Sequence, residues 1–113
     1  MADDNNPELT ERALRDLDDL GKVAKRLALA WLRKFSRGEL AVIPEPLYLP
    51  DPSLRSARMS GGLTVVFRQL RAEELAQLQR RRAQILIVCV VPARELDTWR
   101  QDFLQQISDA SDE

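Results

Sequence analysis

Histidine is absent from this chain, and cysteine occurs once, at Cys89. The lack of histidine excludes Cys–His and Ser–His–Asp nucleophilic catalysis, histidine-ligated zinc or haem, and a histidine pH switch. A single cysteine excludes an internal disulfide, cysteine-rich metal sites and iron–sulfur clusters. Because Cys89 lies within an apolar run, we expect a buried and unreactive thiol. We therefore predict a protein that is not an enzyme and that has no catalytic residue, metal or cofactor.

Long apolar segments are missing as well. The longest, Ile85 to Val91, is too short to span a bilayer, and residues 1–6 are acidic and polar rather than the basic start of a signal peptide. The 113 residues suit one domain, and 44% hydrophobic with 31% charged residues is enough to build a core. We expect a soluble, cytoplasmic protein with a polar tail at 1–6, a single domain at 7–108 and an acidic tail at 109–113.

A helical pattern begins after Asn6, a predicted N-cap, with Pro7 as its first residue, and runs to about Arg37, before Gly38. Two adjacent apolar rows predict a wide buried face: Leu14, Leu17, Gly21, Ala24, Ala28, Trp31 and Phe35 in one, and Leu20, Val23, Leu27 and Ala30 in the other. A helix over 7–37 would be about 46 Å long, more than a domain of this size needs. Three outcomes stay open: a break near Gly21, a projecting helix, or packing against a second copy.

The rest of the chain predicts a small sheet. Four prolines between residues 39 and 62 allow edge strands at most, and we expect these at 41–43 and 47–49, followed by a loop at 53–62. Strands are predicted at 63–67 and 85–91, helices at 72–82 and 93–107. The fold class is α/β with a βαβ-like unit, or α+β if the strands pair antiparallel. The sheet has two to four strands, covered by the long N-terminal helix and the C-terminal amphipathic helix.

Charge is unevenly distributed, although the net charge is −1. Residues 1–19 carry seven acids and two bases, residues 20–94 carry fourteen bases and five acids, and residues 95–113 carry six acids and one base. A basic middle between acidic ends bears on the choice of partner rather than on the fold.

Elimination leaves a non-enzymatic protein-interaction, assembly or regulatory module as the leading hypothesis. The over-long first helix and the proline-stiffened segment 44–52 favour it, because extended proline-rich chain costs little entropy to bind. We predict that a protein partner contacts Arg33, Arg37, Tyr48, Arg55 and Arg58. A homodimer through the first helix also stays open.

The basic middle supports a second hypothesis, binding of nucleic acid. The predicted contacts are Lys22, Lys25, Arg26 and Arg33 on one helix face and the cluster Arg80, Arg81 and Arg82. Only Tyr48 is expected to be an exposed ring, which disfavours single-strand binding by base stacking but not backbone-directed binding to a duplex. A third class, an enzyme, would need a carboxylate site around Glu39, Glu45 or Asp51.

Overall fold

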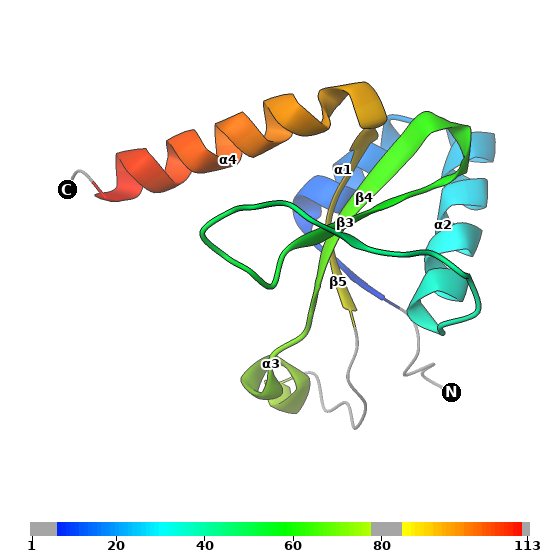
Figure 1. Ribbon diagram of the computed structural model, residues 1–113. Coiled ribbons are helices and arrows are strands. Elements are labelled where there is room, and N and C mark those ends of the chain that lie inside the picture. The colour runs from blue at the N-terminus through cyan, green and yellow to red at the C-terminus, as the bar shows by residue number, and fades with distance from the viewer. Residues whose placement is uncertain (1–6, 78–84, 112–113) are drawn as a thin grey trace.

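Five strands form one mixed sheet in the part of the chain that the computed structural model describes, residues 7–77 and 85–111 (Figure 1). Along the chain the elements are β1 (Glu8–Leu9), α1 (Glu11–Asp18), α2 (Lys22–Ser36), β2 (Glu45–Pro46), β3 (Arg55–Arg58), β4 (Leu63–Gln69), α3 (Ala72–Gln77), β5 (Ile85–Pro92) and α4 (Leu96–Ser111). Short 3₁₀ turns precede β4 at Ser60–Gly62 and α4 at Ala93–Glu95. The fold is therefore α+β, and its sheet has one strand more than the largest predicted sheet.

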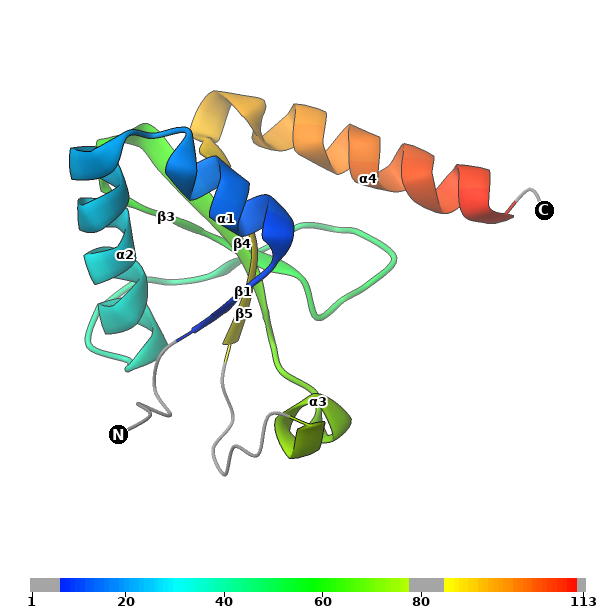
Figure 2. The same cartoon turned by 180° about the vertical axis from the view of Figure 1, so that it is seen from behind.

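The strands lie in the order β1-β5-β4-β3-β2. β1 is parallel to β5, and the other three pairings are antiparallel. The predicted βαβ-like unit is wrong, because the strands at 63–69 and 85–92 are antiparallel neighbours. A parallel pair needs a crossover that returns the chain along the sheet. α3 instead lies beyond the ends of β4 and β5 and covers neither face (Figure 1, Figure 2).

Each face of the sheet carries its own apolar core. Alternation along β4 sends Val65 and Phe67 to one face and Val66 to the other. α1 and α2 cover the first face with four buried residues, Ala13, Leu17, Ala28 and Leu32. The first turns of α4 cover the second face with Leu96, Trp99 and Phe103. Figure 2 shows α1 and α2 side by side, while the far half of α4 runs away from the sheet.

The predicted first helix is two helices, separated by a turn at Gly21. This residue has φ 89° and ψ 165°, a backbone conformation that is essentially confined to glycine. The first helix also starts later than predicted, at Glu11 rather than Pro7, and Thr10 takes the N-cap role expected of Asn6. The glycine turn is thus the first of the three outcomes that the helical pattern left open.

The break changes which helical residues are buried. α2 turns Leu32 to the sheet, where it is fully buried, although neither predicted apolar row contains it. Val23 and Leu27 of the second row are 75% and 67% exposed. The second predicted row is therefore wrong on α2, because this helix turns the opposite side to the sheet. The first predicted row is confirmed there in part, since Ala28 is buried and Trp31 and Phe35 pack against the same core.

Side chains of the first helix complete the hydrogen bonding of the β5 edge. Thr10 caps α1 by accepting from the Ala13 N–H at 3.1 Å and donates its own hydroxyl to the Val88 carbonyl at 2.6 Å. Six residues later, the Asp16 carboxylate accepts from the Val90 N–H at 3.0 Å. Beyond the two-residue β1, α1 therefore satisfies backbone groups that another strand would otherwise pair.

The proline-rich segment departs from the predicted pattern. The short strand in it is β2, at neither 41–43 nor 47–49, and β3 forms within the predicted loop 53–62. Leu47, Leu49 and Leu54 are buried and pack in the same cluster as Trp99. The segment is thus a strap that completes the second core, held down by its leucines.

Candidate interaction surfaces

An apolar row on α2 faces solvent. Val23 and Leu27 are largely exposed, and Ala30, one turn further, is exposed as well. Spacings of four and three residues place the three side chains in line along the helix, on the side opposite Leu32. Single exposed apolar residues are normal on a protein surface, whereas a contiguous apolar row is a candidate interaction surface.

A basic strip runs beside this apolar row. Lys22, Lys25, Arg26 and Arg33, all predicted nucleic-acid contacts, line one shallow depression of about 280 Å³ around Leu29. Residues 22–36 contain five bases and no acid. Lys25 forms an ion pair with Asp18 of α1. Among the described residues, the other three cations have no acidic partner, so the strip keeps most of its positive charge.

The remaining predicted nucleic-acid contacts, Arg80, Arg81 and Arg82, lie outside the described residues. The structure therefore brings together the helical half of that predicted set and gives no position for the other half.

The five predicted protein contacts do not form one surface. Arg33 lies on the basic strip and Arg37 is the C-cap of α2. Arg55 and Arg58 are exposed at the two ends of β3, and strand alternation directs side chains three residues apart to opposite faces. Tyr48 lies on the strap. The five residues are thus distributed over a helix end, a strand and a loop.

Tyr48 is nevertheless an exposed ring, as predicted, with 86% of its surface accessible. Its φ of 56° is the only positive value among the described non-glycine residues. A left-handed conformation is unfavourable for a bulky residue. It persists here because Leu47 and Leu49 on either side are both buried, which leaves the ring between them outside.

A pocket of about 430 Å³ lies between the strap and the sheet. Its lining includes Pro44 and Pro52 of the strap and Arg55, Phe67 and Arg68 of the sheet. The volume is within the range of small-molecule sites, whereas four of the seven lining residues are polar or charged. Which polar groups remain available there depends on the contacts of Arg68.

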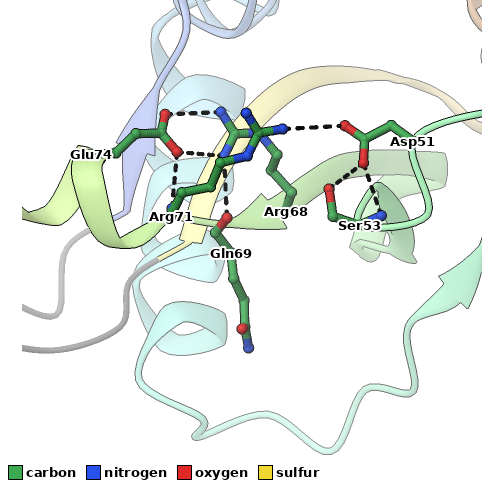
Figure 3. Close-up of polar contacts among 6 residues, drawn as sticks. All are labelled: Asp51, Ser53, Arg68, Gln69, Arg71 and Glu74. Atoms are coloured by element: carbon green, nitrogen blue, oxygen red, sulfur yellow. Dashed lines mark hydrogen bonds and ion pairs between the residues drawn. The ribbon is translucent and has the colours of Figure 1, made fainter.

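Arg68 is fully engaged in a polar latch, shown in Figure 3. Its two terminal nitrogens donate to the two carboxylate oxygens of Glu74 at 2.7 and 2.9 Å. Glu74 also accepts from the Arg71 N–H at 2.9 Å, the return half of a capping box for α3. These contacts lower the pKa of Glu74 to about 2, the Arg68 hydrogen bonds contributing most. The latch therefore fixes α3 to the end of β4, and Arg55 is the remaining charge of the pocket.

A second group of polar contacts, around Asp51, joins the strap to Arg71. Asp51 accepts hydrogen bonds from the N–H and hydroxyl groups of Ser53, which lower its pKa, and lies 3.8 Å from Arg71 (Figure 3). Asp51 is thus used structurally, while Glu39 and Glu45 are exposed. In residues 7–77 and 85–111, no three His, Cys, Asp or Glu side chains are grouped to hold a metal ion.

Cys89 is buried, as predicted. Its exposed fraction is 0%, and burial raises the pKa of its thiol to about 12. The neutral thiol packs with Val66 and Val91 in the core of the α4 face.

Sequence reasoning missed the exposed row of α2 because it assigned Val23 and Leu27 to the core. A usable signal was present. Gly21 divides the helical pattern, and the bases at 22, 26 and 33 lie next to the apolar row on the helix surface. Because Lys and Arg side chains are rarely buried, a row with such neighbours is expected to face solvent.

Within the described residues, no helix has both the length and the apolar character needed to cross a membrane. Compared with protein-family models, with curated proteins and with solved structures, the chain matches none.

Proposed function

We propose that this protein is a non-enzymatic interaction module that docks a protein partner on the outer face of α2. The observation that carries the proposal is the row of Val23, Leu27 and Ala30, exposed beside a strip of cations. Burying an exposed leucine stabilises a complex by about 1.5–3 kcal/mol, and adjacent charges add orientation and speed of encounter. A partner with an apolar ridge flanked by acids fits both features.

The apolar row favours a protein over a nucleic acid as the main partner. Phosphate contacts need cations and hydrogen-bond donors, and they gain nothing from valine and leucine in the centre of the surface. Arg33 of the predicted partner-binding set belongs to this face. We assign Arg37, Tyr48, Arg55 and Arg58 no role in it.

The test is affinity capture with three full-length baits: the wild-type chain, Leu27→Glu and Ile43→Glu. Ile43 is the matched control, because it is 87% exposed and lies outside α2. We expect Leu27→Glu to lose a stoichiometric partner, including further copies of the chain, that Ile43→Glu retains. The proposal is wrong if the two variants capture the same proteins, or if the wild type is strictly monomeric and captures nothing.

Nucleic-acid binding remains a second candidate, because four cations share one depression. With Lys25 paired, three available cations predict a slope near −3 for log K against log salt on duplex DNA, since each neutralised phosphate contributes about −0.9. Fluorescence anisotropy with labelled duplex DNA and RNA measures this slope. Leu27→Ala separates the candidates, since it removes the apolar contact and leaves the cations in place. Absence of binding at about 50 mM salt excludes this function.

A further inference from the structure

The far half of α4, like the outer face of α2, carries an exposed apolar side chain. Leu104 is 42% exposed, Ile107 lies near it at a spacing of three residues, and the helix continues away from the sheet (Figure 1, Figure 2). The first turns of the same helix are anchored by Trp99 and Phe103, whose rings stack at 5.3 Å. The first turns of α4 are thus fixed to the domain, while its far half extends away from the sheet.

Charge complements the apolar contacts. Residues 22–36 carry five bases and no acid, whereas the last ten residues, 104–113, carry three acids and no base. Opposite charges on two surfaces favour their encounter and fix their orientation. Because the bases of α2 and the acids at the end of the sequence are separated in one nearly neutral chain, each copy is complementary to the next.

We propose that the far half of α4 of one copy docks on the α2 face of a second copy. This inference rests on the proposed docking function of α2 and names its occupant. A chain's own α4 cannot be that occupant, because its base packs on the opposite face of the sheet and its far half points away from α2 (Figure 2).

The size of the contact determines its strength. The row from Val23 to Ala30 spans about 10 Å and the α4 segment from Leu104 to Ser111 a similar length, at 1.5 Å per residue. A contact of two helical turns buries less than the roughly 1,200 Å² of stable interfaces, so we expect a dissociation constant of about 10–100 μM or weaker. The contact joins two different surfaces, so it forms head-to-tail chains or rings rather than a two-fold dimer.

The experiment is sedimentation velocity of full-length chains from about 5 μM to 500 μM, a range that brackets the expected dissociation constant. Leu27→Glu disables the α2 surface and leaves α4 intact, and Leu104→Glu does the reverse. We expect each variant alone to associate at least ~10-fold more weakly than the wild type, because each buries a charge in an apolar contact. Mixing them leaves one intact pair of surfaces, so a 1:1 complex that grows no further is expected. Ile43→Glu should associate like the wild type.

Three outcomes overturn the inference. A two-fold dimer that Leu27→Glu abolishes and Leu104→Glu leaves intact would mean α2 packing on α2. Failure of the two variants to complement each other would exclude α4 as the occupant. A wild type that is monomeric up to 500 μM, while Leu27→Glu still loses a captured partner, refutes self-association and leaves the proposed function standing.

Discussion

The latch between Arg68 and Glu74 makes a pH-dependent contribution to stability that can be worked out from its geometry. Both hydrogen bonds are short, and the side chains are only 14% and 29% exposed. Lowering the pKa of Glu74 from 4.5 to about 2 corresponds to a ceiling of about 3.4 kcal/mol. Because water reaches part of the carboxylate, we expect Glu74→Gln to cost about 1–2 kcal/mol at pH 7.

The sign of the pH dependence follows from the direction of the shift. The folded pKa lies below the unfolded value, so the contribution is complete above pH 4.5 and is lost as the pH falls toward 2. With these pKa values, the difference between wild type and Glu74→Gln should fall by about half between pH 7 and pH 3.

The assay is urea unfolding followed by the fluorescence of Trp31 and Trp99, at a series of pH values from 7 to 3. Glu73→Gln is the matched control, because Glu73 occupies the same first turn of α3 and is exposed. It should lose only a few tenths of a kcal/mol, from the helix dipole. Equal losses for the two variants at every pH, or a Glu74→Gln loss that does not diminish on acidification, would refute the reasoning.

Three further experiments test the fold. Leu32→Ala should destabilise the protein by about 2–5 kcal/mol and Leu27→Ala by less than about 0.5, because only the first side chain is buried; equal urea midpoint shifts would contradict the assigned helix face. Asp16→Ala should cost about 1–3 kcal/mol in the same assay by leaving the buried Val90 N–H without its acceptor, and a neutral result would show that this contact is dispensable. Cys89 should react with Ellman's reagent at least ~100-fold more slowly in the native than in the unfolded protein, and fast native labelling would contradict its burial.

The regular parts of the sheet could be predicted from local sequence. The β-branched residues around Val65 and the apolar run around Cys89 mark β4 and β5, and the amphipathic spacing of Trp99 and Phe103 marks α4. These segments bury residues at the period of their own element, so the pattern alone predicts them.

Other elements depend on contacts distant in sequence. β3 has the sequence Arg-Ser-Ala-Arg, with no β-branched or aromatic residue. It is a strand because its backbone pairs with β4 over Arg55–Arg58. Thr10 becomes an N-cap while bonding to Val88, which is 78 positions away. Neither partner is visible in a local window of sequence.

The candidate surface could be predicted only in part for a similar reason. The cations of α2 were assigned to one face from their spacing, and the structure places them around one depression. The apolar row beside them was assigned to the core, because a pattern of 31 residues was treated as one helix. Gly21 separates the two helices, and α2 buries Ala28 and Leu32 while Val23 and Leu27 stay exposed.

The central claim, that the outer face of α2 receives the far half of α4 from a second copy, is tested most directly by amide NMR of the ¹⁵N-labelled full-length chain over a dilution series. The account predicts that the amides of Val23, Leu27 and Ala30 shift with concentration together with those of Leu104 and Ile107. Invariant α2 amides at the highest concentration, or shifts confined to other exposed residues, would contradict it.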